Sequence, residues 1–169
     1  MNAMKKRWIS IYVENETGVL ARISGLFSGK SYNIDSLSVG VTEDPTVSRM
    51  TISVTSDDKT FEQIKKQLNR SVEVIKVLDF TDISLHMKEL MFVKINSCSE
   101  KDKAEAFRIA QVYGVTITDC NKNTLLLECT QTEEKNAALL KILSSTFGYR
   151  LEVVRGGAVA IESVSYSER

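Results

Sequence analysis

Alternation of apolar and polar residues marks the first element of the chain. Over residues 7–13, Ile9, Ile11 and Val13 share one face, which predicts a half-buried strand. The period then changes to that of a helix over residues 19–27, where apolar side chains recur as one stripe. The polar residues at 15–17 are expected to cap this helix, and Gly29 is placed to end it.

The rest of the first half continues with two alternating segments, a helix and a last strand. Residues 33–42 and 48–55 alternate as strands, residues 57–69 have helical spacing, and residues 73–80 return to strand. The resulting order is βαββαβ. Right-handed crossovers turn this order into a four-stranded antiparallel sheet with two helices on one face.

The second half repeats the same order about 80 residues later. We expect a strand at 88–97, a helix at 100–113 that buries Ala104, Phe107 and Ala110, and a hairpin formed by 115–120 and 124–129. A helix at 132–147 and a strand at 151–154 complete the unit. The sequence therefore predicts an α+β protein with two ferredoxin-like βαββαβ domains, at residues 1–80 and 88–169, joined by a linker at 81–87.

Charge and composition exclude several classes of protein. Lys plus Arg and Asp plus Glu both number 22, so there is no excess positive charge for a nucleic acid partner. No apolar run approaches the ~20 residues that span a bilayer, and the first residues lack the apolar block of a signal peptide. We expect a cytoplasmic protein that does not bind membranes.

Candidate chemistry is sparse. Cys98, Cys120 and Cys129 are odd in number and lack a C-x-x-C pair, so we expect neither a disulfide framework nor a metal site. The single histidine, His86, falls in the predicted linker, away from any group it could activate. Paired carboxylates at 57–58 and 133–134 lie at predicted helix starts, where the helix dipole accounts for them. No catalytic residues are predicted.

One segment has the chemistry of a binding site. Residues 14–20 end a strand in polar side chains and begin a helix at Gly18, where free backbone amides can hold a carboxylate. The amide of Asn15 can pair with an ammonium and a carboxylate, and Val19 and Leu20 add apolar surface. Asn33 and Ile34 end the following loop. The alternative is that Asn15 and Asn33 only cap and turn the chain, and spacing alone favours that reading.

Several longer motifs occur in one order along the first half. They are the segments 14–22 (ENETGVLAR), 25–28 (GLFS), 32–37 (YNIDSL), 44–52 (DPTVSRMTI), 63–68 (QIKKQL) and 74–77 (VIKV). Together they resemble the small-subunit family of acetohydroxyacid synthase, also called acetolactate synthase. The second half is a looser match, through residues 89–95 (ELMFVKI) and 155–157 (RGG).

This resemblance implies an amino-acid-sensing ACT domain in the first half and a non-catalytic regulatory subunit as the whole. Such subunits form homodimers, activate a thiamine-dependent catalytic large subunit, and confer feedback inhibition by a branched-chain amino acid, usually valine. The effector would lie between two protomers. By position, the resemblance assigns the effector site to Asn15, Gly18, Val19 and Leu20 of one chain, with Asn33 and Ile34 of the other.

The resemblance also bears on cofactors and on one departure from the family. Thiamine diphosphate, magnesium and flavin belong to the large subunit, so this chain is expected to bind no cofactor. Ser31 stands where the family often has Gly, which affects the shape of the loop before Asn33.

Three other functions fit a βαββαβ chain. An RNA-recognition protein would need exposed aromatics on its third strand, and residues 48–54 contain none. A small enzyme of the acylphosphatase kind would need a phosphate-binding loop, which Gly156-Gly157 does not provide. A free-standing ACT sensor that regulates a different enzyme stays open as the alternative.

Overall fold

The structure is a computed structural model that describes residues 3–164. The chain divides into two compact units. Among the described residues, the first unit consists of residues 3–86 together with residues 159–164, and the second consists of Met87–Ala158.

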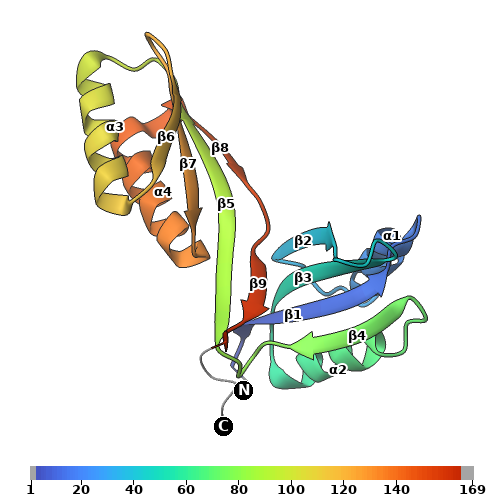
Figure 1. The fold of residues 1–169 in the computed structure, drawn as a ribbon. Coiled ribbons are helices and arrows are strands. Elements are labelled where there is room, and N and C mark those ends of the chain that lie inside the picture. The colour runs from blue at the N-terminus through green and yellow to red at the C-terminus, as the bar shows by residue number, and fades with distance from the viewer. Residues whose placement is uncertain (1–2, 165–169) are drawn as a thin grey trace. The chain divides into compact units, whose positions relative to one another are not determined.

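The first unit is a four-stranded antiparallel sheet with both helices on one face (Figure 1). Its elements are β1 (Lys5–Glu14), α1 (Val19–Ser28), β2 (Ser36–Val41), β3 (Val47–Ser56), α2 (Asp58–Leu68) and β4 (Val74–Asp79). The strand order is β2-β3-β1-β4, which confirms the predicted ferredoxin-like topology. Strand β2 is therefore an edge strand.

The core of this unit lies between the sheet and the helices. The predicted alternation of β1 is confirmed, because Ile9, Ile11 and Val13 are fully buried. They pack with the buried stripes of α1 and α2, namely Val19, Ile23, Phe27, Phe61, Ile64 and Leu68. Among the described residues of this unit, no helix covers the opposite face of the sheet (Figure 1).

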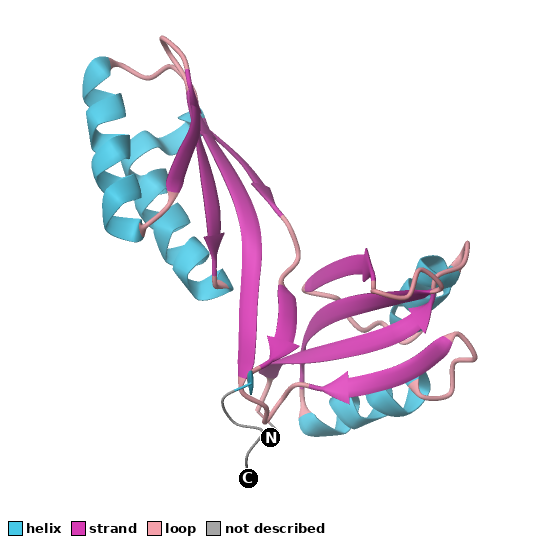
Figure 2. Cartoon of the chain, in the orientation of Figure 1, coloured by secondary structure: helices cyan, strands magenta, loops and turns pink. Residues whose placement is uncertain are grey.

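The second unit repeats this arrangement. Its elements are β5 (Leu85–Ile95), α3 (Glu100–Tyr113), β6 (Thr116–Cys120), β7 (Leu125–Gln131), α4 (Glu133–Phe147), a short 3-10 turn (Gly148–Arg150) and β8 (Leu151–Arg155). The strand order β6-β7-β5-β8 corresponds to β2-β3-β1-β4, strand for strand. Figure 2 shows α3 and α4 together on one face of this sheet. The internal repeat read from the sequence is confirmed.

Helix ends follow the local sequence in the second unit. Ser99 caps α3, and its side chain and that of Asp102 form a reciprocal capping box. Thr132 caps α4, and Gly148 ends it with φ of 58°. In the first unit Asp57 caps α2 by accepting from the backbone N–H of Thr60 at 2.7 Å.

Several strand boundaries differ from those expected, and one strand was not predicted. Strand β2, for example, starts at Ser36 instead of residue 33. Strand β5 starts at Leu85 instead of residue 88, so its first residues come from the segment predicted as linker. A further strand, β9 (Val159–Glu162), was not predicted; it pairs with β5, the strand that passes from one unit to the other. A strand this short shows little alternation, which explains why its sequence alone does not reveal it.

The buried face of α3 was predicted wrongly. Ala104 and Phe107 are exposed, with Phe107 at 52%, whereas Ala106 and Ile109 are buried with Ala110. Apolar residues occur on more than one side of this helix, so their spacing does not fix its rotation about the axis. The β-branched Ile109 faces the core in place of the larger Phe107.

Candidate functional site

The predicted effector loop begins where β1 ends, and Asn15 ties it to the connection between β2 and β3. The Asn15 backbone N–H donates to the Thr46 carbonyl at 2.7 Å. Its side-chain Nδ2 donates to the Pro45 carbonyl at 2.9 Å, and its Oδ1 accepts from the Ser48 hydroxyl at 3.0 Å. The prediction that Asn15 caps α1 is wrong. Its side chain bonds to a loop about thirty residues further along the chain and not to the first turn of the helix.

This arrangement leaves Asn15 half of its bonding capacity. A side-chain amide has two N–H groups and an oxygen with two lone pairs. Pro45 takes one N–H, and Ser48 occupies one lone pair. One donor and one acceptor remain on an exposed side chain whose orientation is already set, so Asn15 can still pair with both charged groups of an amino acid.

Gly18 starts α1 with a backbone conformation that favours glycine. Its φ is 87°, and no side chain caps the helix at this residue. A Cβ added to Gly18 would lie 3.1 Å from a guanidinium nitrogen of Arg22. Arg22 in turn pairs with Glu73 through a 2.5 Å contact, just before β4. The glycine therefore keeps the first turn of α1 open on the side that Arg22 borders.

The two apolar residues of the predicted site differ in exposure. Val19 is buried in the core, whereas Leu20 is 46% exposed. Further exposed apolar side chains lie on the edge strand β2, where Val39 is 45% and Val41 59% exposed. Apolar surface is thus available beside α1 and along the free edge of the sheet.

Asn33 and Ile34 lie at the other end of α1. Ile34 packs against the core, and Asn33 is exposed, with its Nδ2 donating to Asp35 at 3.4 Å. The chain reaches them through Ser31, which has φ of 57°. Helix α1 ends at Gly29 as predicted, although Gly29 has a right-handed conformation and the left-handed residue, Ser31, follows two positions later. Ser31 adopts the conformation that a Gly would provide.

Asn33 also lines a cavity of about 430 Å³. The cavity lies between the loop after α1, the end of β3 and the first turns of α2; its lining includes Met4, Tyr32, Val54, Thr60 and Ile64. Its wall also includes Ser56, whose buried hydroxyl has no hydrogen-bond partner within the described residues. The surroundings of Asn33 are thus partly apolar and only partly satisfied in their hydrogen bonding.

The predicted residues therefore form two separate groups. Helix α1 has 10 residues, so its ends are ~15 Å apart at 1.5 Å per residue. Asn15, Gly18, Val19 and Leu20 lie at its start, and Asn33 and Ile34 follow its end. A small amino acid cannot touch both groups of one chain at once.

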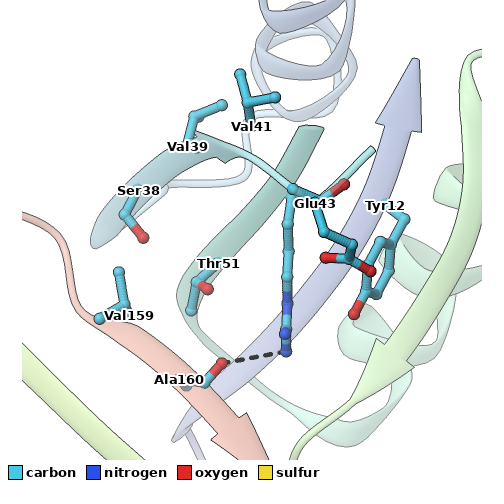
Figure 3. A pocket seen from close by; sticks show the side chains of 11 residues that line it. Tyr12, Ser38, Val39, Val41, Glu43, Thr51, Val159 and Ala160 are labelled. Atoms are coloured by element: carbon cyan, nitrogen blue, oxygen red, sulfur yellow. Dashed lines mark hydrogen bonds between the residues drawn. The ribbon is translucent and has the colours of Figure 1, made fainter. Parts of the chain in front are cut away.

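A second cavity, of about 280 Å³, lies on the sheet face opposite the helices (Figure 3). Ser38 and Thr51 lie on the side of their strands toward Val159 and Ala160, whereas Val39 and Val41 point away (Figure 3). Arg49 also lines this cavity. Its Nε donates to the Ser10 hydroxyl at 2.8 Å, and its Nη2 donates to the Ala160 carbonyl at 3.1 Å, the bond dashed in Figure 3.

Sequence reasoning assigned no role to Arg49. Its guanidinium also stacks on the rings of Tyr12, at 5.2 Å, and Phe80, at 5.9 Å. The signal was an arginine among the small polar residues of an alternating strand, on the face away from the core. Because Arg49 is engaged by strands β1 and β9 and by two aromatic rings, we regard it as a structural residue of the sheet.

The residues excluded from catalysis lie in ordinary structural settings. His86 is in β5, and its Nε2 lies 3.4 Å from the Ser163 hydroxyl. Cys98 and Cys129 are buried, and burial raises the pKa of the Cys129 thiol to about 11. Among residues 3–164, no group of three or more His, Cys, Asp or Glu could hold a metal ion. Within the same range, no helix has the length and apolar character to cross a membrane.

Comparison with known families assigns each half of the chain. Residues 9–76 match a model described as an AHAS small subunit-like ACT domain, and residues 88–164 match one described as the small subunit of acetolactate synthase. The chain is 40% identical over 158 residues to the acetolactate synthase small subunit of Aquifex aeolicus, covering 94% of this chain and 81% of that protein.

Other similar proteins are acetolactate synthase small subunits as well. The probable acetolactate synthase small subunit of Archaeoglobus fulgidus is 38% identical, over 92% of this chain and 96% of its own length. The crystal structure of the acetolactate synthase small subunit from Thermotoga maritima superposes with a TM-score of 0.83 at 31% identity. That match covers 94% of this chain and 98% of the other.

Proposed function

The chain belongs to the acetolactate synthase small-subunit family, and from this premise we propose that it activates the catalytic large subunit and confers feedback inhibition by a branched-chain amino acid. The observation that supports this proposal is the split of the candidate site across α1. Residues suited to the charged groups and side chain of an amino acid are present, but one chain does not bring them together.

A homodimer completes such a site. Strand β2 is a free edge of the first sheet, and Val39 and Val41 on it are exposed. An unpaired, partly apolar edge favours pairing with a second copy, and a two-fold axis places the same elements of both copies against each other. We propose that the α1 start of one protomer then faces Asn33 and Ile34 of the other, with the effector between them.

Each residue has a defined part in the proposed site. The backbone amides at Gly18 and the free N–H of Asn15 receive the effector carboxylate, and the remaining lone pair of Asn15 accepts from the ammonium group. Leu20 supplies exposed apolar surface for a branched side chain, with Val19 beneath it. Asn33 adds a polar contact from the partner, and Ile34 holds that loop against the core.

The proposal extends to cofactors. We propose that thiamine diphosphate, magnesium and flavin are held by the large subunit. We propose that the regulatory chain holds none of them and acts on catalysis only through assembly.

The dimer is tested by light scattering of the purified protein. We expect twice the 18.9 kDa chain mass. Val39→Asp, which places a charge on the β2 edge, should shift the protein to monomer. Val72→Asp is the matched control, because Val72 is 90% exposed and lies away from that edge. A wild-type monomer at micromolar concentration, with or without valine, would contradict the proposal.

Assembly is tested by mixing the protein with the catalytic large subunit of acetolactate synthase from the same organism. We expect the two to co-purify and the activity of the large subunit to rise. If they neither associate nor change activity, the chain is a sensor for a different enzyme.

A further inference from the structure

A groove on the first unit is lined by basic and amide side chains. Residues Gln63, Lys66, Gln67 and Arg70 recur at helical spacing along and just beyond α2, so they form one row. Lys30 and Tyr32, from the loop after α1, face this row. Together the six residues line a cavity of about 290 Å³, which we call the basic groove.

The positive charges of the basic groove are not neutralised. Within residues 3–164, neither Lys30, Lys66 nor Arg70 forms an ion pair, and the lining contains no carboxylate. Lys65, on the adjacent side of α2, contrasts with them because it pairs with both Glu62 and Asp79. The whole chain has 22 basic and 22 acidic residues, so this excess is local.

The helix dipole explains only part of this clustering. Cations near the end of α2 interact favourably with its negative end, which accounts for Lys66 and Arg70. It does not account for Lys30, which comes from a different element and has its side chain in the same groove. The pattern indicates a surface that receives negative charge from outside the chain.

The groove is poorly suited to a phosphate. Phosphate sites generally use free backbone amides, often at a helix start. Here the backbone N–H groups of Lys30 and Tyr32 both donate to the Phe27 carbonyl, and that of Arg70 donates to Gln67. Negative charge can be held only by long side chains, which suits carboxylates presented along an extended protein segment.

We propose that the basic groove docks an acidic segment of the catalytic large subunit. This inference rests on the proposed function, which supplies the partner, and adds the surface through which it is bound. Lys30, Lys66 and Arg70 attract the carboxylates, and the Gln63 and Gln67 amides bond to the partner's backbone. The half-buried Tyr32 ring, held to α2 by its 3.2 Å bond to Gln63, provides apolar contact.

Docking there has a consequence for the effector site. Lys30 and Tyr32 belong to the same short loop as Asn33, which also lines the adjoining 430 Å³ cavity. A partner seated in the basic groove therefore holds the loop that presents Asn33 to the effector.

The test compares two pairs of charge reversals in the full chain. Lys66→Glu with Arg70→Glu alters the groove, and Lys59→Glu with Lys76→Glu makes the same change of net charge at exposed positions outside it. Affinity for the large subunit is measured by biolayer interferometry at low and high salt, with activation of the large subunit as a second readout. The groove pair should weaken affinity about tenfold or more at low salt, whereas the control pair should change it less than about twofold.

Further measurements separate the possible outcomes. Lys66→Gln with Arg70→Gln removes charge without reversing it and should give an intermediate loss, and unchanged valine binding shows that the variants are folded. Suppose that wild type activates the large subunit. If the groove pair then leaves the affinity unchanged, or if both pairs weaken it equally, the docking proposal is overturned and the proposed function stands. The docking proposal is also overturned if the groove variant binds inorganic tripolyphosphate more weakly than wild type does but binds the large subunit equally well. If wild type itself fails to bind or activate, the proposed function fails.

Discussion

Gly18 is the residue whose replacement tests the effector site most specifically. Gly18→Asp places a carboxylate where the effector carboxylate is proposed to bind, and like charges at close range cost several kcal/mol, so affinity should fall by at least ~2 kcal/mol. The φ of 87° adds a strain of ~1 kcal/mol to the fold. Calorimetric titration with valine measures the first effect and thermal unfolding the second.

Gly18→Asn is the matched control for this variant. Asn tolerates a left-handed backbone better than most residues and has no charge. Because Asn adds no negative charge beside the effector carboxylate, its effect on valine affinity should stay below ~1 kcal/mol. Equal losses in the two variants would mean that size and not charge matters, and the carboxylate would have to bind elsewhere.

Asn33 provides an independent test from the other end of α1. Asn33→Ala should weaken valine binding by ~1–3 kcal/mol, because it leaves a polar group of the effector without its partner. Asn69→Ala removes a comparable exposed amide, which donates to the Lys65 carbonyl outside the proposed site, and should leave affinity unchanged. Unchanged calorimetric affinity in Asn33→Ala would remove this residue from the site.

Replacing Ser31 with glycine should make the fold more stable. It has φ of 57°, a conformation that costs an L-residue energy and glycine none, so Ser31→Gly should raise the free energy of unfolding by ~0.5–1 kcal/mol. Ser28→Gly, inside the last turn of α1, should lower it by a similar ~0.5–1 kcal/mol. Urea denaturation that shows the same sign for both substitutions would refute the backbone explanation.

At the scale of elements, the order and period of the segments were enough to predict both sheets. Alternation in β1 and the helical stripes of α1 and α2 are confirmed, and right-handed crossovers allow one strand order for βαββαβ. The errors arose where several solutions fit the pattern. Helix α3 has apolar residues on more than one of its sides, so periodicity did not determine which side is buried. Strand β9 has only four residues, too few for periodicity to reveal it.

The Asp102 carboxyl group at the start of α3 should make the stability of the fold depend on pH. Asp102 closes the capping box and accepts from Arg150 at 2.9 and 3.0 Å. Hydrogen bonds from Arg150, then from Ser99, hold the pKa of Asp102 well below its ordinary value. A carboxyl group with a lowered pKa in the folded state stabilises the fold at neutral pH, and this contribution is lost as pH falls below ~4.

Asp102→Asn should therefore lower the unfolding temperature at neutral pH and have a smaller effect in acid. Thermal unfolding followed by circular dichroism from about pH 7 to about pH 3 measures the difference. Asp119→Asn, at an exposed carboxylate on β6, should give a curve close to wild type. A constant difference between Asp102→Asn and wild type across this range would exclude the ion pair as its cause.

On the scale of the whole molecule, the sequence identified the candidate residues but not their connections. Asn15 donates to the Pro45 carbonyl and accepts from the Ser48 hydroxyl, and these bonds join residues 30 and 33 positions apart, a relation that no local pattern contains. They link the loop of the proposed effector site to the stiff segment around Pro45 that connects β2 to β3. We therefore expect a change at the loop of the proposed effector site to reach the edge strand at which two copies are proposed to pair.

This connection offers a route by which effector binding affects the catalytic subunit. We propose that the activating and effector-bound states differ in the pairing of the two protomers, and that the effector binds the second state more tightly. By linkage, the catalytic subunit must then weaken effector binding by the same factor by which the effector weakens assembly.

The most direct test of this account is a pair of calorimetric titrations of valine, one into the regulatory protein alone and one into its complex with the catalytic large subunit. We expect weaker binding of valine to the complex, by a factor of about 5–150 for a typical coupling, and an equal weakening of assembly when valine is saturating. Equal valine affinity in the two titrations would contradict it, because a ligand that binds both states equally cannot shift the equilibrium between them.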